Sequence, residues 1–211
     1  MFKKLFGFGN KQEPRQLTSV SQLEQRDIIT FKHRQILPEN LQGGSFEVTK
    51  VASYQYDDGS VKELTLRDEH NVSYFLALED NDGDPQLALS RKLPRKQVLS
   101  IFNEDDFADL WQPGFSELVC QTTPDELAGW LNGSYQQTVN EGEAYYYERD
   151  LQLASASAYQ DDDGEPLRYH ECEGADDRYG LNIEVWSDGS TDVAVTIYCP
   201  VDIIEAFHPH D

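Results

Sequence analysis

Three aspartates, Asp80, Asp82 and Asp84, alternate within the stretch LALEDNDGDPQLALS. Alternating acids are the first ligands of an EF-hand loop, so this spacing suggests calcium binding. An EF-hand also needs glycine at its sixth position and a bidentate glutamate at its twelfth, where this chain has Pro85 and Arg91. The flanking residues alternate as strands do. We therefore predict a hairpin turn at this stretch and no calcium site.

A second candidate metal site contains His170 and Cys172, which are two positions apart on a predicted strand. Side chains at this spacing face the same side of a strand. Cys199 or a histidine of the C-terminal HPHD could complete a tetrahedral zinc site. However, the spacing matches no established zinc motif, and the corresponding strand in the first half has Thr65 and Arg67 instead. We expect a buried thiol beside a surface histidine, and no bound metal.

Motifs of the common enzyme families are missing from the sequence. It contains no GxSxG, GxxxxGK[ST], GxGxxG or HExxH. With 39 acidic side chains, many arbitrary carboxylate pairs can be found, so a pair alone does not indicate acid–base catalysis. The run Tyr145–Tyr147 could be a ligand platform, but its alternation also fits a half-buried edge strand, which we favour. The protein is predicted to be no enzyme and to carry no cofactor.

The net charge of −22 is unevenly distributed along the chain. Residues 1–16 carry a net +3 and residues 17–104 a net −4, whereas residues 105–211 carry a net −21 and contain no lysine. Direct binding of nucleic acid is not expected, because affinity for phosphates comes from clustered Lys and Arg. The acidity is consistent with a role in solubility alone or with a partner that has a basic surface.

The three cysteines, Cys120, Cys172 and Cys199, form no CxxC pair and are odd in number, which disfavours a disulfide framework. The apolar part of the N-terminal MFKKLFGFGN is too short for a signal peptide, and no cleavage site follows it. No segment approaches the ~20 apolar residues of a transmembrane helix. We therefore predict a cytoplasmic protein whose thiols pack as small core residues.

Two halves of the sequence share a pattern, which we interpret as an internal duplication. The segment SYQYDDGSVKELTL aligns with AYQDDDGEPLRYHE, and YFLALE aligns with YGLNIE, both at an offset of 105 residues. After a slip of one residue, DGDPQLALSRKLP aligns with DGSTDVAVTIYCP. Each copy then ends on a short apolar segment, QVLSIF or DIIEAF.

Each copy is predicted to be an antiparallel meander of four strands separated by acidic turns. The expected strands are FEVTKVASYQY, VKELTLR, VSYFLALE and QLALS in the first copy, and LQLASASAYQ, PLRYHE, YGLNIEVW and TDVAVTIY in the second. Thr123, Pro124 and Glu126 have the spacing of a capped helix start in TTPDELAGWL, and NEDDFADLW is also predicted to be helical.

The predicted fold class is mainly β (α+β), with two tandem, duplicated antiparallel meander or open-barrel domains and a few short helices. The expected organisation is a basic and apolar tail with a linker at 1–16, a first β domain at 17–104, a connecting helix or linker at 105–120, and a second, strongly acidic β domain at 121–211.

The stretch YQYDDGSVKELTLRDEHNVSYFLALE resembles an uncharacterised family of small bacterial β domains. Members share a strand, an acidic turn, an E-x-x-L motif and a hairpin, and here Glu63, Leu66 and the strand YFLALE carry the resemblance. The likeness extends over residues 44–92, whereas the second half departs from it with Arg168 near the place of Glu63. The family has no assigned activity, so the resemblance implies a non-enzymatic adaptor.

The N-terminal tail is a predicted contact region. Phe2, Leu5 and Phe6 would share one face of a short helix, with Lys3 and Lys4 on the other side. Such a face could contact a protein partner or rest peripherally on an anionic membrane surface. The acidic turns of the second half supply the other predicted contact residues, Asp161, Asp162, Asp163, Asp176 and Asp177.

Together these features predict a non-catalytic cytosolic interaction or adaptor protein, whose acidic second domain binds a protein partner with a basic surface. Two alternatives belong to other functional classes. One is an acidic DNA mimic that inhibits a DNA-binding protein, and the other is a β domain that binds a small molecule.

Overall fold

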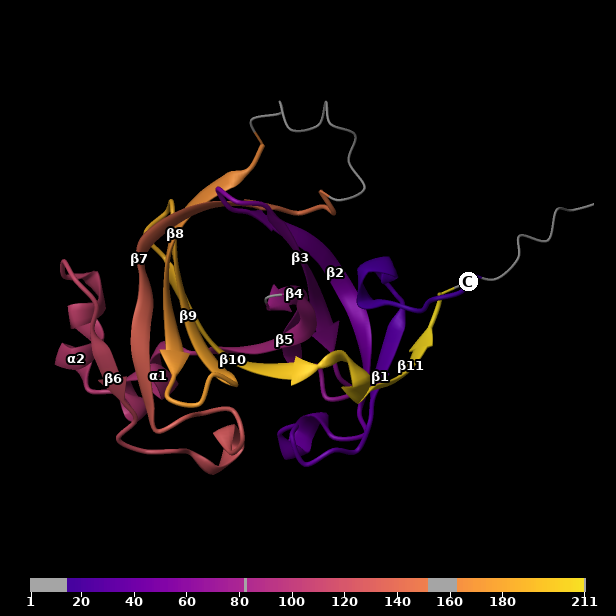
Figure 1. The fold of residues 1–211 in the computed structure, drawn as a ribbon, viewed down its shortest axis with the longest axis horizontal. Helices are drawn as coiled ribbons and strands as arrows, with labels where there is room; N and C mark the ends of the chain where they lie inside the picture. The colour runs from indigo at the N-terminus through magenta and orange to yellow at the C-terminus, as the bar shows by residue number, and fades with distance from the viewer. Residues whose placement is uncertain (1–14, 82, 152–162, 211) are drawn as a thin grey trace, which may run out of the picture.

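The computed structural model describes residues 15–81, 83–151 and 163–210. Its main feature is a closed barrel of eight antiparallel strands, seen end-on as a ring in Figure 1. Around the ring the order is β2-β3-β4-β5-β10-β9-β8-β7, and β7 pairs with β2 to close it. The strands are β2 (Ser45–Gln55), β3 (Ser60–Arg67), β4 (Ser73–Asn81), β5 (Asp84–Leu93), β7 (Ser134–Tyr147), β8 (Glu165–Gly174), β9 (Tyr179–Trp186) and β10 (Thr191–Pro200).

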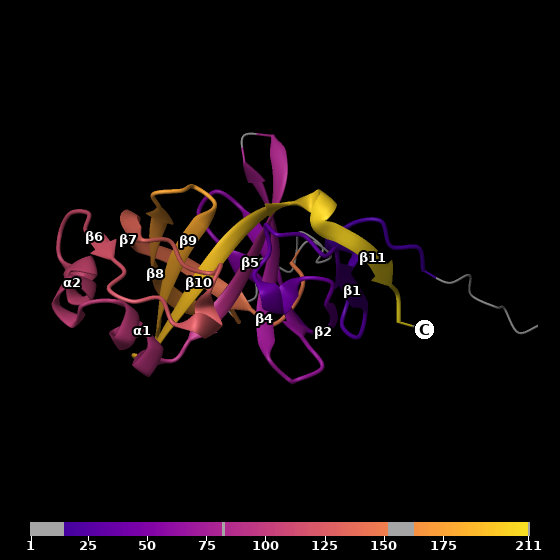
Figure 2. The ribbon, with the colours of Figure 1, turned by 90° about the horizontal axis from the view of Figure 1, so that it is seen from below.

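The remaining elements lie around the outside of this ring (Figures 1 and 2). They include β1 (Ile28–Phe31), β6 (Glu117–Val119), β11 (Ile204–His208), α1 (Arg95–Ile101) and α2 (Glu104–Ala108). Short 3-10 helices are found at η1 (Val20–Gln22), η2 (Glu39–Leu41), η3 (Asp109–Trp111), η4 (Asp125–Leu127) and η6 (Val201–Ile203). None of the helices in the described residues is long and apolar enough to cross a membrane.

The prediction of two tandem domains is wrong, because both halves of the chain build the same barrel. Strands β2–β5 form one meander and β7–β10 the other, and the two join where β5 pairs with β10 and β2 pairs with β7. A meander of four strands leaves an unpaired edge on each side, and pairing with the other meander removes both edges. The shared barrel does not show that the sequence arose by duplication.

Most of the individual strands were predicted close to their observed positions. All four strands of the first half and the last three of the second half are present, and YGLNIEVW coincides with β9. The predicted strand LQLASASAYQ falls almost entirely outside the described residues. In its place, β7 supplies the fourth strand of the second meander, and it contains Tyr145–Tyr147.

The helix predictions had mixed outcomes. The segment NEDDFADLW forms α2 and η3, and the side chain of Asn103 caps the first turn of α2. The helix predicted from Thr123 is only the single turn η4, and its N-cap residue is Pro124. Gly129 has a φ of +80°, a left-handed conformation that does not continue a helix.

The apolar core lies between the outer face of the barrel and the segments that cover it. Alternate residues of each strand point outward, and those of the barrel wall include Leu64, Leu66, Leu76, Leu89, Leu181, Ile183, Val195 and Ile197, all buried. The covering residues come from the N-terminal segment and from the connection between the meanders, and include Val20, Leu23, Leu41, Val98, Ile101, Phe102, Leu127 and Trp130. Burial of this apolar surface is the main source of stability.

Trp130 illustrates how a covering segment is fixed on the wall. Its ring stacks on Tyr74 of β4 with centroids 5.9 Å apart and planes 7° apart. The Trp130 indole N–H donates to Asn40 Oδ1 at 3.2 Å, and Asn40 Nδ2 donates to the Tyr74 hydroxyl at 2.7 Å. Three segments that are distant in sequence are thereby joined by one stacked and hydrogen-bonded group.

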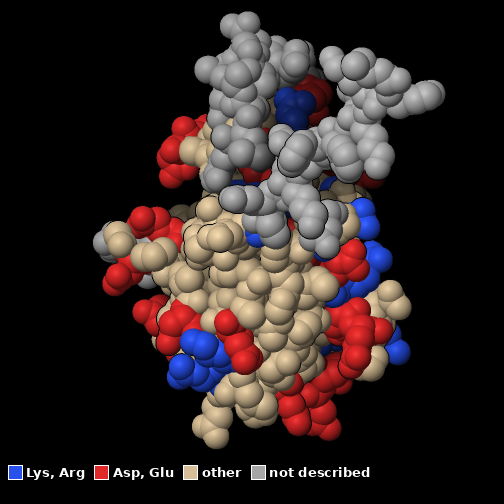
Figure 3. Space-filling model, turned by 90° about the vertical axis from the view of Figure 1, so that its right-hand side faces the viewer, with Lys and Arg blue, Asp and Glu red and all other residues tan. Residues whose placement is uncertain are grey.

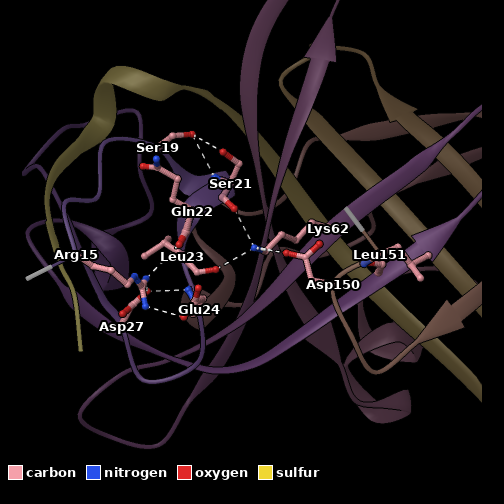
Figure 4. A network of polar contacts seen from close by, with 11 residues as sticks. Arg15, Ser19, Ser21, Gln22, Leu23, Glu24, Asp27, Lys62, Asp150 and Leu151 are labelled. Atoms are coloured by element: carbon pink, nitrogen blue, oxygen red, sulfur yellow. Dashed lines mark hydrogen bonds and ion pairs between the residues drawn. The ribbon is translucent and has the colours of Figure 1, made fainter. Parts of the chain in front are cut away.

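A buried lysine attaches the N-terminal segment to the barrel (Figure 4). Lys62 of β3 points outward, and its ammonium group lies 2.6 Å from Asp150 Oδ2. It also donates to the carbonyl oxygens of Ser21 and Leu23, each at 2.9 Å. Because Lys62 is 7% exposed and Asp150 9% exposed, this ion pair is shielded from water.

A second polar group in the same region surrounds Asp27 (Figure 4). Its carboxylate lies 2.5 Å from Arg15 Nη2 and accepts backbone N–H groups of Glu24 and His210 at 2.7 and 2.8 Å. Burial would raise the pKa of Asp27, but these partners outweigh it and hold the pKa below its usual value. Both ends of the described chain are thus fixed to one carboxylate.

Candidate binding site in the barrel interior

The interior of the barrel is lined by polar and charged side chains as well as aromatic ones. The register of the strands defines the inward set, because residues directly opposite in an antiparallel pair share a face. Lys50 is opposite Thr65 on this face, Glu63 is opposite Ala77, and Tyr169 is opposite Glu184. The charged members include Lys50, Glu63, Glu79, Lys92, Glu165, Glu171, Glu173, Glu184 and Asp192.

Two pairs of glutamates face each other across the interior. Glu63 of β3 repels Glu184 of β9, and Glu79 of β4 repels Glu171 of β8. In each pair the two strands are separated by three others in either direction around the ring, so their side chains approach only across the interior. This facing arrangement brings together residues from both halves of the sequence.

Burial and this repulsion raise the pKa values of the interior carboxyl groups. Burial and the facing Glu184 raise the pKa of Glu63 to about 8. Burial and Glu79 raise the pKa of Glu171 to about 7. Burial also raises the pKa values of Glu79 and Glu184. Glu63 and Glu171 therefore bind protons near neutral pH, where an exposed glutamate is ionised.

Lys92 places an ammonium group in the interior. Its Nζ lies 2.6 Å from Asp192 Oδ2 and 3.6 Å from Glu184 Oε2. The same atom is 5.1 Å from the ring centroid of Phe75 and 6.0 Å from that of Trp186. Burial would lower the pKa of Lys92, but Glu184 and Asp192 outweigh it, so the pKa is raised. The interior thus holds one ammonium group between carboxylates and aromatic faces, an arrangement that stabilises cations.

Glu63, Glu79 and Glu171 are less well compensated: Lys92 and Lys50 attract Glu63 without forming an ion pair with it. Within the described part of the chain, the side chains of Glu63, Glu79 and Glu171 accept no hydrogen bond and form no ion pair. No basic residue lowers the pKa of Glu79 or Glu171. Glu184 Oε2 is buried and accepts no hydrogen bond, with Lys92 as its ion-pair partner. When its carboxyl groups are ionised, the interior therefore carries more negative charge than its own cations compensate.

A cavity of about 340 Å³ opens into this interior near the turn between β9 and β10. Its lining includes Glu63, Lys92 and the aromatic side chains of Tyr54, Phe75, Tyr146 and Trp186. The rings of Tyr54 and Tyr146 are 5.2 Å apart, and Trp186 meets Tyr146 edge-on at 5.5 Å. These rings belong to an aromatic cluster separate from the core outside the wall. A concave site with convergent charged and aromatic groups is typical of a small-ligand site.

The predicted metal residues lie on the opposite, outer face of the wall. His170 and Cys172 share that face, as predicted, but the histidine is buried instead of exposed. The His170 ring lies 5.0 Å from that of Trp111, and its Nδ1 is 3.3 Å from Gln137 Nε2. Burial lowers the pKa of His170. Among the residues placed by the structure, no group of three or more His, Cys, Asp or Glu side chains is arranged to hold a metal ion.

The three thiols are reduced and do not face the interior. Cys172 and Cys199 are buried in the outer core, and Cys120 is partly buried against it. Burial raises the pKa of Cys172 to about 12 and those of Cys120 and Cys199 to about 11. Because the thiolate is the reactive form, these cysteines are unreactive packing residues, as predicted from the sequence.

The stretch first compared with an EF-hand is the hairpin turn between β4 and β5. Asn81 pairs with Asp84, and the carboxylate of Asp80 accepts the backbone N–H of Gly83 at 2.6 Å. Gly83 has a φ of +92°, which glycine adopts without strain in such a turn. Asp82 lies outside the described residues.

The predicted acidic contact residues do not form one cluster. Asp163 precedes β8 and forms an ion pair with Arg149, whereas Asp176 and Asp177 follow β8 at its other end and are exposed. Asp161, Asp162, Phe2, Leu5 and Phe6 lie outside the described residues. Figure 3 shows the side of the molecule with β1 and β11, where acidic and basic side chains are interspersed around an uncharged area.

The interior residues were not identified from the sequence as candidates for function. One available signal was that Glu79 and Glu184 occupy matching positions in the two halves, each at the end of the aligned segments YFLALE and YGLNIE. That match shows that both glutamates share a strand position. It does not show which side of the strand faces solvent.

The chain belongs to the family described as "Domain of unknown function (DUF4178)", which matches residues 40–200. This range contains all eight strands of the barrel, whereas β1 and β11 lie outside it. No curated protein and no solved structure matches the chain. The resemblance to an uncharacterised family is therefore confirmed.

Proposed function

We propose that this protein is a non-catalytic binding module whose barrel interior takes a small organic cation with an ammonium group. The observation that carries the proposal is the environment of Lys92, whose ammonium group lies between two carboxylates and two aromatic rings. Carboxylates and ring faces are the groups that recognise alkylammonium ions in proteins. Glu63 lines the same cavity, and within the described structure Lys92 and Lys50 attract it without forming an ion pair with it.

The charge of the interior supports a cationic ligand over an anionic one. Both inward lysines are already paired, Lys92 with Asp192 and Lys50 with Glu148, so an anion would meet only occupied cations and unpaired carboxylates. A neutral apolar ligand would remove water from the carboxylates without replacing its hydrogen bonds, which is costly. An ammonium ion supplies both the charge and the donors.

The absence of a catalytic role is part of the same proposal. No histidine or cysteine of the described strands faces the interior, because His170, Cys172 and Cys199 lie on the outer face. The inward hydroxyl groups of Ser90 and Thr196 hydrogen-bond to each other at 2.7 Å. This pairing leaves neither hydroxyl next to an imidazole base that could activate it.

The test is calorimetric titration of the full chain with butylamine and with butanol, which has a similar shape without the charge. The titrations are made at roughly pH 9, above the pKa of about 8 of Glu63. We expect the amine alone to bind, and the variant Glu63→Gln to bind it at least ~10-fold more weakly. Glu47→Gln, an exposed carboxylate of β2, is the matched control and should bind as the unmodified chain does.

Two results would overturn the proposal. One is equal binding of butanol and butylamine, which would assign the cavity to apolar ligands. The other is a loss of amine binding in Glu47→Gln as large as in Glu63→Gln, which would assign the binding to the overall negative charge of −22.

An adaptor role is a second proposal, and the excess of acidic side chains in residues 105–211 favours it. The exposed Asp176 and Asp177 would contribute to a surface for a cytoplasmic partner with basic side chains. A pull-down with the full chain, compared with a chain that lacks residues 1–13, tests the partner and the tail together. Displacement of DNA from the captured protein would favour mimicry of DNA instead.

A further inference from the structure

We infer that the ligand of the barrel interior is a linear aliphatic diamine that places one ammonium group at each of two levels of carboxylates. The first level consists of Glu63 and Glu184, and the second of Glu79 and Glu171. The inference rests on the proposed function, since it assumes that the interior binds a cation, and it adds the number of charges and their separation.

The strand register fixes the separation of the two levels. Glu63 is directly opposite Ala77 of β4, and Glu79 is two residues further along that strand. Glu184 is directly opposite Tyr169 of β8, and Glu171 is likewise two residues further. Two residues of a strand span about 6.6 Å, so this is the approximate distance between levels measured along a strand.

Both displacements point toward the same end of the barrel. Strands β4 and β8 are connected around the ring by four antiparallel pairs: β4–β5, β5–β10, β10–β9 and β9–β8. Because each pair reverses the strand direction, four pairs leave β4 and β8 running in the same direction. Glu79 and Glu171 therefore lie together at the level nearer to the β4–β5 and β8–β9 turns. Glu63 and Glu184 lie together at the level nearer to the β9–β10 turn and the mouth of the cavity.

When the carboxyl groups are ionised, neither level has its negative charge balanced by the residues placed by the structure. At the first level three carboxyl groups, Glu63, Glu184 and Asp192, share the ammonium group of Lys92, and Lys50 attracts Glu63 more weakly. At the second level Glu79 and Glu171 interact with other carboxylates and with no lysine or arginine. One ammonium group would compensate one level only, whereas a diamine compensates both.

Aromatic rings of the interior cluster lie near both levels and offer apolar faces to an alkyl chain. Burial raises the pKa of Tyr56, and Glu171 of the second level and Glu184 and Glu63 of the first raise it further, so the Tyr56 hydroxyl lies near both levels. Its ring meets that of Tyr169 at 5.3 Å and 76°, and it stacks beside Tyr54 at 6.2 Å. Methylene groups packed between such rings are removed from water, while the ammonium ends stay at the carboxylates.

The experiment compares putrescine with butylamine, which has the same carbon chain and one amine fewer. In the unmodified full chain, putrescine should bind with one-to-one stoichiometry and at least ~10-fold more tightly than butylamine. The variant Glu171→Gln should lose most of this advantage while its affinity for butylamine stays unchanged. Ethylenediamine is too short to reach both levels and should bind no better than butylamine.

The matched control is Asp177→Asn, which removes the same charge from an exposed turn at the same end of the barrel. It should keep the full preference for putrescine. Equal affinities for putrescine and butylamine, or the same loss in Asp177→Asn as in Glu171→Gln, would overturn the diamine inference and leave the cation site intact. If neither amine binds more tightly than butanol, the proposed function itself fails.

Discussion

Lys62 and Glu63 are neighbours on β3, and their side chains leave the barrel wall in opposite directions. The Lys62 ammonium group points outward and bonds to Asp150 and to two backbone carbonyl groups. The Glu63 carboxyl group points inward and faces Glu184. One strand therefore carries an ion-paired lysine in the outer shell and, in the interior, a carboxyl group with no direct ion pair to a described residue. The two residues allow separate tests of stability and of function.

The variant Lys62→Met should be strongly destabilised. It leaves the Asp150 carboxylate and the carbonyl groups of Ser21 and Leu23 buried without their donor, and breaking a buried ion pair in this way costs about 3–5 kcal/mol. The free energy of unfolding from urea titrations measures the loss. The double variant Lys62→Met, Asp150→Leu should recover part of it. A loss of unfolding free energy below about 1 kcal/mol would show that the Lys62–Asp150 ion pair contributes no more than a solvent-exposed ion pair.

Glu63 should make the fold less stable as the pH rises. Its pKa is about 8 when folded and near the ordinary 4.5 when unfolded, so the folded state binds the proton more tightly. The stabilisation is present at low pH and declines between about pH 4.5 and 8. Glu63→Gln should therefore exceed the unmodified chain in stability at roughly pH 9, by at least ~1.4 kcal/mol. Urea titrations over this pH range measure the difference, and a variant that is less stable at high pH would refute the assignment.

Removal of Lys92 should create a site for an added amine. In Lys92→Ala, Glu184 and Asp192 lose their counter-ion, and the melting temperature should fall. Methylammonium chloride should restore much of the lost stability, whereas the same concentration of sodium chloride should not. Thermal melts monitored by tryptophan fluorescence follow both effects. Equal stabilisation of Lys92→Ala and the unmodified chain by methylammonium would contradict the account.

Neither half of the chain should fold alone. Residues 17–104 contain β2–β5 and residues 121–211 contain β7–β10, so each half lacks the strands that pair with its two edges. Each fragment should show no cooperative thermal transition, and mixing the two should restore one. A cooperative transition in either isolated fragment would contradict the single barrel.

The sequence indicated the strands better than their arrangement. Alternation around Leu64 and Leu66 correctly predicted β3, because one face of that strand is buried in the core. The same alternation does not distinguish a polar face in solvent from one in a barrel interior. That distinction depends on the pairing of β5 with β10 and of β2 with β7, between strands that are distant in sequence. The facing of Glu63 and Glu184 was inaccessible for the same reason.

Local signals also overestimated one helix. Thr123, Pro124 and Glu126 have the spacing of a capped helix start, yet only the turn η4 forms there. Trp130 instead packs on Tyr74, and this tertiary contact takes precedence over the short-range propensity. Asn103, by contrast, caps α2 as a local signal should, since no competing contact removes its side chain from the backbone N–H groups.

Proton release on amine binding tests most directly whether the interior carboxyl groups form the site. Near pH 7 Glu63 is mostly protonated and Glu171 about half protonated, with pKa values of about 8 and 7, and an ammonium ion beside them favours their ionised forms. Calorimetry of putrescine binding in two buffers with different heats of ionisation counts the protons released. We predict that fewer protons are released in Glu63→Gln and in Glu171→Gln, and that the number is unchanged in Asp177→Asn. The affinity of the unmodified chain for putrescine should rise between roughly pH 6 and 9. Binding heats independent of the buffer, with an affinity independent of pH, would contradict the account.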